Sequence, residues 1–218
     1  SGCVHANRPA LMSSIVMGYP HTQFQPGNLT ITGAGGIVLP LQWNKSAGEL
    51  VTHLYFGQNR NRISIVPDTG SQFMVVTGQG CRQCLPSGDV TTIGTSTYDE
   101  TGEFTGQTSH IAYGSQSNGL AWYRDTVSML GQHSALFEFA VIREVTAGTR
   151  FTLNILGLCS ATYVDDEKQD FVSQLFNRDG HFMPYFYFNL GSRENATLVL
   201  GDRWPMPLDS IQMLTSID

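Results

Sequence analysis

Apolar residues occur along this chain in short runs, separated by Gly, Asn, Asp and Ser about every eight to twelve residues. Short apolar runs between turn-forming residues are typical of an all-β domain. The pattern predicts strands over residues 36–43, 50–56, 62–67, 73–77, 109–113, 119–130, 134–145, 182–189 and 196–200. Residues 1–34 have no clear period and contain several prolines, so we expect an irregular extension that docks on one folded domain, residues 35–218.

One segment has helical rather than strand periodicity. In residues 165–176, Phe171, Val172, Leu175 and Phe176 fall on one side of a helix, and acidic residues occupy the first turn. The segment therefore predicts a short amphipathic helix lying on a sheet. The acidic residues are interpreted as surface charge that complements the helix dipole rather than as a metal site.

Composition excludes several functional classes. With 218 residues and 41% hydrophobic residues, the chain can bury a full core. The net charge of −6 and the absence of a basic stripe argue against nucleic-acid binding. The apolar runs are shorter than the roughly 20 residues of a membrane-spanning helix, and the scattered histidines predict no metal site and no cofactor. The chain begins at Ser1 without a Met, so we expect a processed product.

The four cysteines, Cys3, Cys81, Cys84 and Cys159, allow three disulfide pairings. The Cys81–Cys84 spacing favours a small loop-closing disulfide over a zinc or redox site, because no second close pair of ligands accompanies it. Three glycosylation sequons, at Asn28, Asn44 and Asn195, agree with an oxidising compartment. We expect a secreted, luminal or virion-associated protein.

The stretch with the most chemical information is residues 63–71. An apolar segment, residues 63–67, runs directly into Asp68, Thr69, Gly70 and Ser71. Asp-Thr-Gly alone also suits an ordinary turn. Here it resembles the active-site signature of the pepsin-like aspartic proteases, in which apolar residues precede Asp-Thr-Gly-Ser.

Further segments resemble the amino-terminal lobe of that family in the same order. Tyr113, Gly114 and Ser115 are similar to the start of the flap hairpin, and residues 119–127, which end in Asp-Thr-Val, resemble its return strand. Ile155, Leu156 and Gly157 resemble the second half of the psi-shaped loop that supports the catalytic Asp, and Cys81 and Cys84 fall where the family has a small disulfide loop. The resemblance covers residues 48–218 and implies an all-β single lobe, a psi-loop barrel or sandwich with a short helix and a flap.

The resemblance also implies roles for individual residues. Asp68 would activate water, Thr69 and Ser71 would tune and brace the Asp68 carboxylate, and the Gly70 amide would help the loop to hold its shape. Tyr113, Gly114, Ser115, Phe73 and Met74 would contact an extended peptide with bulky apolar side chains. This chemistry needs two carboxylates that share one proton, so an acidic optimum is expected.

Only one Asp-Thr-Gly occurs in the chain. We expect a homodimer in which Asp68 and its symmetry mate form the catalytic pair, as in the retroviral aspartic proteases. A heterodimer with a complementary second lobe and a non-catalytic lobe that binds a partner are the alternatives. Three departures from the family pattern bear on the last alternative: Pro67 precedes Asp68, no Trp follows Ser71 closely, and Asn154 replaces an Asp.

Overall fold

A computed structural model gives the arrangement of the chain. It describes residues 14–18, 37–44, 49–84, 97–113, 116–129, 133–147, 152–159, 170–171, 173–175, 185–190 and 196–200. The strands are β1 (Ser14–Gly18), β2 (Ile37–Pro40), β3 (Gln42–Asn44), β4 (Glu49–Phe56), β5 (Asn61–Asp68), β6 (Met74–Arg82), β7 (Glu103–Tyr113), β8 (Gln116–Met129), β9 (His133–Ala147), β10 (Ile155–Gly157), β11 (Tyr185–Asn189) and β12 (Thr197–Leu200). Strands dominate the described residues, which confirms the predicted all-β class.

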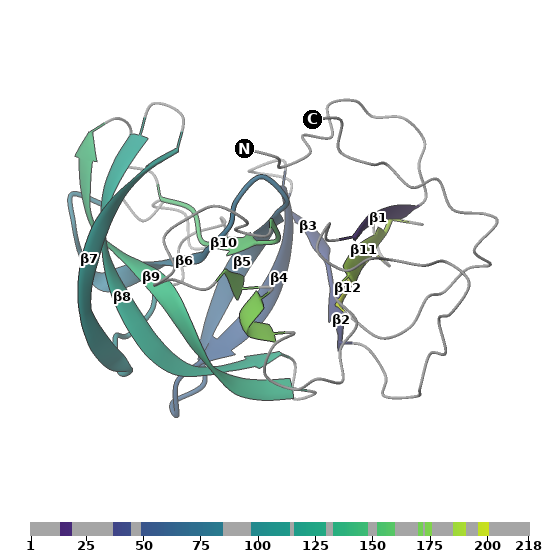
Figure 1. The fold of residues 1–218 in the computed structure, drawn as a ribbon, viewed down its shortest axis with the longest axis horizontal. Coiled ribbons are helices and arrows are strands. Elements are labelled where there is room, and N and C mark those ends of the chain that lie inside the picture. Colours follow the sequence, from purple (N-terminus) through teal and green to yellow (C-terminus); the bar gives the residue numbers. More distant parts are fainter. Residues whose placement is uncertain are drawn as a thin grey trace.

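The larger sheet closes into a barrel. Its strand order is β3-β4-β5-β10-β6-β9-β8-β7, and an additional pairing joins β4 to β8 (Figure 1). The closure pairs Tyr55 with Ser128 and Phe56 with Val127. Closing the sheet removes two exposed strand edges, and only β3 and β7 extend beyond the ring.

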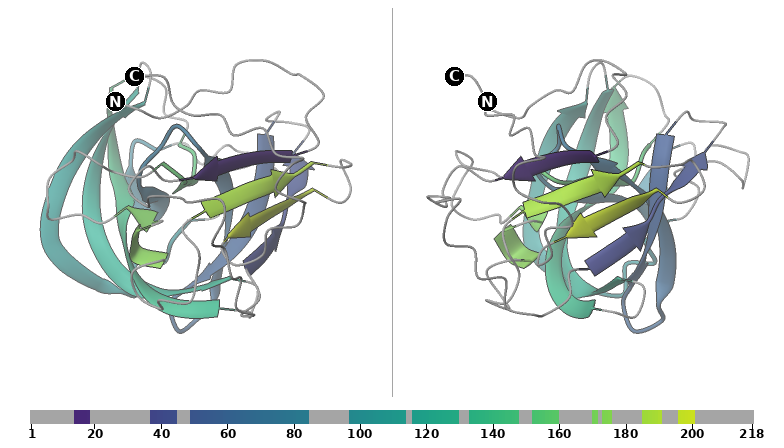
Figure 2. Two further views of the ribbon diagram at one scale, coloured as in Figure 1. Left: turned by 45° about the vertical axis from the view of Figure 1, so that its right-hand side comes forward. Right: turned by 90° about the vertical axis from the view of Figure 1, so that its right-hand side faces the viewer.

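A second sheet of four strands has the order β1-β11-β12-β2, and Figure 2 shows these strands side by side. All three pairings are antiparallel. Strand β1 lies inside the segment that the sequence predicted to be irregular, where Ser14 pairs with Asn189 and Gly18 with Tyr185. The short apolar run of β1 gave no period of its own, and its strand structure comes from pairing with β11.

Both sheets share one hydrophobic core. Leu39 of β2 and Leu198 of β12 are fully buried in the same cluster as Leu54, Phe56 and Ile63 of the barrel. Along β2 the burial alternates between buried and exposed residues, as expected for a strand with one face on a core. Burying each of these large side chains stabilises the fold by about 1.5–3 kcal/mol.

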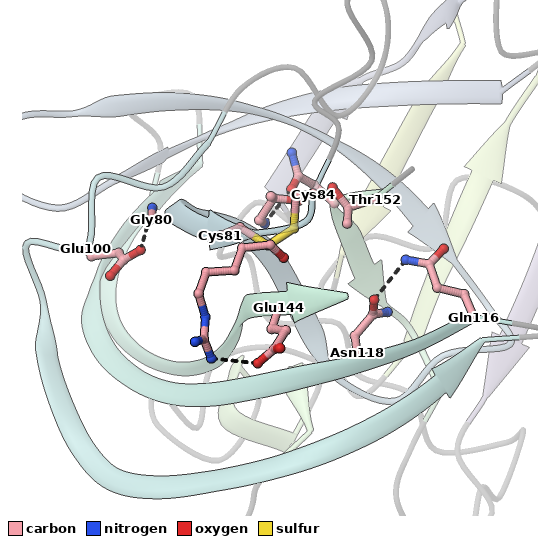
Figure 3. The surroundings of a disulfide bond; sticks show 11 residues. Gly80, Cys81, Cys84, Glu100, Gln116, Asn118, Glu144 and Thr152 are labelled. Carbon is pink, nitrogen blue, oxygen red and sulfur yellow. Dashed lines mark hydrogen bonds and ion pairs between the residues drawn. A yellow bond between two sulfur atoms is a disulfide. The ribbon is translucent and has the colours of Figure 1, made fainter. Parts of the chain in front are cut away.

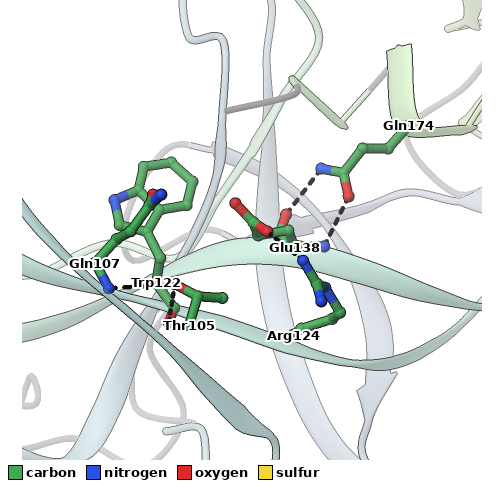
Figure 4. Close-up of polar contacts among 6 residues, drawn as sticks. All are labelled: Thr105, Gln107, Trp122, Arg124, Glu138 and Gln174. Carbon is green, nitrogen blue, oxygen red and sulfur yellow. Dashed lines mark hydrogen bonds and ion pairs between the residues drawn. The ribbon is translucent and has the colours of Figure 1, made fainter. Parts of the chain in front are cut away.

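The predicted helix is only partly described. Phe171 and residues 173–175 are helical, and the rest of residues 165–176 lies outside the described residues. Asp170 caps this turn, because its Oδ1 accepts a hydrogen bond from the Ser173 amide at 2.7 Å. Gln174 then joins the helix to β9: its Oε1 accepts from the Glu138 amide at 2.7 Å and its Nε2 donates to the Glu138 carbonyl at 2.8 Å (Figure 4). In the part of the chain that the structure describes, no helix is long and apolar enough to cross a membrane.

Candidate active site

The Asp68 carboxylate stands at the carboxyl end of β5, where the chain turns back toward β6. Its Oδ1 accepts a hydrogen bond from the Gly70 amide at 2.8 Å. Its Oδ2 accepts a hydrogen bond from the Ser71 hydroxyl. Asp68 and Thr69 are half-buried, whereas the Ser71 side chain is buried beneath them. The loop thus orients both carboxylate oxygens with donors from its own backbone and side chains while leaving the carboxylate accessible.

Strand β10 supports this loop from one side. It lies between β5, to which it is parallel, and β6, to which it is antiparallel, and Gly157 pairs with Asp68. The Leu158 amide donates to the Asp68 carbonyl at 2.9 Å, and the Cys159 amide donates to the Ser71 carbonyl at 2.9 Å. Two segments about 90 residues apart in sequence are therefore locked together at the carboxylate.

The residues of β10 have different roles in this support. A Cβ on Gly157 would lie 2.6 Å from backbone atoms of Gln72 and Phe73, so only glycine fits there. Ile155 and Leu156 were expected to support Asp68 together. Their side chains pack into two different hydrophobic clusters, because successive side chains of a strand point to opposite faces.

Asn154 contributes a structural contact that the sequence showed only as a departure from the family pattern. Its side chain is fully buried, its Oδ1 accepts from the Thr77 amide at 2.8 Å, and its Nδ2 donates to the Ser64 carbonyl at 3.0 Å. Its own carbonyl accepts from the Val66 amide at 2.9 Å. An amide offers both a donor and an acceptor, so one side chain joins β5 to β6 just before the loop.

Pro67 does not interrupt the strand pairing around Asp68. The register between β4 and β5 ends where Thr52 pairs with Ile65, so Pro67 lies beyond this ladder. The bonds to the β10 side are made by the Val66 amide and the Asp68 carbonyl. The missing N–H of Pro67 therefore takes no bond away from the ladder with β4, nor from the contacts that Val66 and Asp68 make with the β10 side.

The predicted substrate-contacting residues separate into three groups. Phe73 is half-buried beside the loop, with its ring centroid 5.2 Å from that of Trp122 in an edge-to-face arrangement. Met74 was also expected to line a pocket, but it is 1% exposed and lies in the main core, because it is the first residue of β6 to point inward. Tyr113 ends β7 and pairs with Gln116; its side chain, Gly114 and Ser115 lie outside the described residues.

A second carboxylate is buried at the base of the β7–β8 hairpin. Asp125 Oδ2 accepts from the Tyr98 hydroxyl at 2.7 Å, and Oδ1 accepts from the Thr126 amide at 2.7 Å. Burial first, and then the bond to Asp125, raises the pKa of Tyr98 above its usual value, so its hydroxyl remains a donor. Tyr98 falls between the strands that the sequence predicted and was missed, since nothing in its local pattern indicated a buried partner.

The predicted disulfide between Cys81 and Cys84 is present at the end of β6 (Figure 3). Both cysteines pack on the hydrophobic cluster that contains Trp122 and Ile155. Beside them, Arg82 forms an exposed ion pair with Glu144 at 2.7 Å. Among the described residues, no group of His, Cys, Asp and Glu side chains is arranged to hold a metal ion.

Comparison with known proteins gives the family of this fold. A search of curated proteins finds no match. The family model for the eukaryotic aspartyl protease matches residues 49–203, which is more than two thirds of the 218 residues. The match includes β4–β12, the Asp68 loop and its β10 support. The chain therefore belongs to the eukaryotic aspartyl protease family and forms a pepsin-like lobe.

Proposed function

We propose that this chain is an aspartic endopeptidase in which Asp68 activates the water that attacks a peptide bond. The orientation of the Asp68 carboxylate carries the proposal: Gly70 and Ser71 each donate to one of its oxygens, and β10 fixes its backbone. A carboxylate that is oriented but still accessible suits a catalytic base, because it must exchange a proton with a substrate water. The family membership supports the same reaction class.

The second carboxylate of the site comes, in this proposal, from a second copy of the chain. The sequence contains a single Asp-Thr-Gly, and the reaction needs one carboxylate to take a proton from water while the other donates to the carbonyl oxygen. A two-fold axis through the site would bring Asp68 and its symmetry mate together. A complementary lobe on another chain would supply the same group and is the competing source.

The hairpin formed by β7 and β8 is the proposed flap. It would close on an extended peptide and exclude water from the reacting bond, with Tyr113 and the tip residues Gly114 and Ser115 nearest the substrate. Phe73 offers apolar surface beside Asp68, so we propose peptides with bulky apolar side chains at the cut, including the chain's own termini. Since one carboxylate must be protonated and the other ionised, activity should be highest at acidic pH.

The test compares the wild-type chain with Asp68→Asn and with Asp99→Asn, a matched change at a carboxylate outside the loop. Each is incubated with a peptide mixture from about pH 3 to pH 7, over a series of protein concentrations. The proposal expects cleavage by the wild type and by Asp99→Asn but not by Asp68→Asn. The rate should rise faster than linearly at low concentration, as dimers form.

Mixing experiments identify the source of the second carboxylate. In a homodimer, an excess of Asp68→Asn chain converts wild-type subunits into mixed pairs, so wild-type activity should fall steeply. A rate that is linear in concentration and unaffected by the excess contradicts the homodimer. If the wild type cleaves nothing at any concentration, the homodimeric protease is wrong, and a non-catalytic binding lobe or a lobe awaiting its complement takes its place.

A further inference from the structure

Trp122 lies opposite an irregular stretch of the β7–β8 hairpin. Phe104 pairs with Tyr123 and Thr108 pairs with Ala121, so three residues of β7 face Trp122 alone. In this stretch Gly106 has a φ of +82° and no atom within 4 Å of the position a Cβ would take. The ladder is therefore interrupted at residues 105–107, and the outer part of the hairpin joins its base through a bulge.

Two polar contacts hold Trp122 across this bulge, and Figure 4 shows the one with Thr105. The Thr105 hydroxyl donates to the Trp122 carbonyl at 3.1 Å. On the other side of the bulge, the indole Nε1 of Trp122 donates to the Ser109 hydroxyl at 2.9 Å. Trp122 is 2% exposed, so an indole N–H that lost Ser109 would be left without water to replace it. The bond therefore favours one position of Ser109, and with it one position of the outer hairpin.

The same indole ring reaches the Asp68 loop. Its edge-to-face contact with Phe73 has a centroid distance of 5.2 Å, and the Phe73 carbonyl accepts from the Gly157 amide at 3.2 Å. Gly157 is the residue that pairs with Asp68. The Trp122 ring is packed in a buried cluster with Val75, Leu120, Ala140, Ile142 and Ile155. One rigid side chain thus contacts the hairpin through its N–H and the catalytic loop through its ring.

We propose that Trp122 is a positioning residue, which sets the outer hairpin, residues 108–113 and 116–120, at a fixed place relative to the Asp68 loop. This rests on the proposed function, in which that hairpin closes on a peptide. Residues 105–107 are the point at which the hairpin bends, and the Trp122–Ser109 bond holds it in the arrangement that accepts substrate. When the hairpin leaves this arrangement, a smaller fraction of the molecules can bind substrate. The apparent affinity then weakens more than kcat falls, because kcat describes molecules that have already bound.

The test uses Ser109→Ala, which removes the acceptor at a half-buried site, and Trp122→Phe, which removes the N–H and keeps an aromatic ring. Ser109→Thr retains a hydroxyl and is the rescue variant. Ser128→Ala is the matched control, because it also removes a serine hydroxyl that forms a side-chain hydrogen bond, here donated to Ser134 at 3.0 Å and away from the bulge. Three quantities are measured: hydrogen exchange of the amides of residues 108–113, the Kd of a statine-containing peptide that cannot be cleaved, and KM and kcat for a peptide substrate.

Ser109→Ala and Trp122→Phe should each speed exchange in residues 108–113 and raise both KM and Kd by about three- to tenfold, with a smaller change in kcat. Ser109→Thr and Ser128→Ala should behave as the wild type. A role in stability alone would lower the amount of active protein while leaving KM, Kd and local exchange unchanged, and this result overturns the proposal.

Failure of the proposed function gives a different result. If the wild type neither cleaves peptides nor binds the statine peptide, the protease proposal fails, and the exchange measurement still decides whether Trp122 holds the hairpin. Unchanged exchange in both Ser109→Ala and Trp122→Phe contradicts the positioning role whether or not the chain is a protease. Because Ser109→Ala changes only one half-buried hydroxyl, its result stands even if Trp122→Phe does not fold.

Discussion

Asp68 and Asp125 are each followed by a threonine, and each carboxylate accepts hydrogen bonds from one backbone N–H and from at least one hydroxyl. For Asp68 the donors are Gly70 and Ser71, two and three residues along the same loop. For Asp125 the donors are the Thr126 amide and the hydroxyls of Tyr98 and Thr101, which are 27 and 24 residues away. Asp68 is half-buried at a strand end, whereas Asp125 is 9% exposed within β8.

The difference shows how one residue type serves two purposes. Donors from the carboxylate's own loop orient it without covering it, so its protonation and its contact with water remain available for chemistry. When the donor comes from a distant segment, the hydrogen bond holds that segment against the strand that carries the carboxylate. Here it holds the chain before β7 against β8. Changing Asp68 should therefore affect activity, and changing Asp125 should affect stability.

Asp68→Asn should give the largest effect. The amide keeps the shape of the side chain but cannot act as a base, so we expect kcat/KM to fall by at least about 10³-fold. The free energy of unfolding, measured by urea denaturation, should change by less than about 1 kcal/mol, because an amide oxygen can still accept from Gly70. A loss of stability as large as that of Asp125→Ala would contradict the distinction between the two carboxylates.

Asp125→Ala should lower the free energy of unfolding by about 3 kcal/mol. The change leaves the buried Tyr98 hydroxyl and the Thr126 amide without the partner described here, and both losses carry a desolvation penalty. Tyr98→Phe is the companion variant: it removes the bond to Asp125 and also the acceptor of the Gly102 amide, 2.7 Å from the Tyr98 hydroxyl, so it should cost about 2 kcal/mol. Urea denaturation measures both, and kcat of the folded fraction should remain near that of the wild type.

Gly157→Ala should lower both stability and activity, whereas the two previous variants each affect mainly one of them. A Cβ at 2.6 Å from the Gln72 and Phe73 backbone forces β10 away from the Asp68 loop. We expect a loss of about 2 kcal/mol in unfolding free energy and a fall in kcat, because the loop that orients Asp68 is displaced. Gly119→Ala is the control: its Cβ would make only ordinary contacts, the nearest at 3.7 Å. Equal effects of the two substitutions would mean that the close approach at Gly157 is unimportant.

Several strands of the barrel could be predicted from the sequence because they are long and turn-forming residues bound them. The segments predicted at 50–56 and 62–67 are the centres of β4 and β5. Strands that depend on distant partners were harder: β1 is defined by β11, and β7 begins at Glu103, six residues before the predicted start. The start of β7 was missed because the bulge at residues 105–107 breaks the alternation on which the prediction depended.

The sequence predicted which residues form the Asp68 loop, but it did not predict how the surrounding side chains are arranged. Asp68, Gly70 and Ser71 lie in one local loop, so a short motif contained their geometry. The burial of Met74 and the opposite directions of Ile155 and Leu156 depend on strand register, which a motif does not contain. The contacts of Asn154, Tyr98 and Trp122 join segments far apart in sequence, and a single sequence holds no signal for such pairs.

His53 should give the smallest effect on stability. Like Asp68 it is a titratable side chain that is only half-buried, and its protonation should change the free energy of unfolding with pH. Its Nδ1 lies 3.1 Å from the Ser64 hydroxyl, and burial, followed by the charge of Arg62, lowers the pKa of His53 below 6.5. The unfolded chain therefore binds a proton at a higher pH than the folded chain does. His53 should stabilise the fold above about pH 6.5, and this contribution should be lost as the pH falls from 6.5 to the folded pKa. Urea denaturation of wild type and His53→Gln at pH 7.5 and pH 5 isolates the effect from that of the carboxylates. The wild type should lose more stability than the variant on acidification; an equal loss would mean that His53 is not the group responsible.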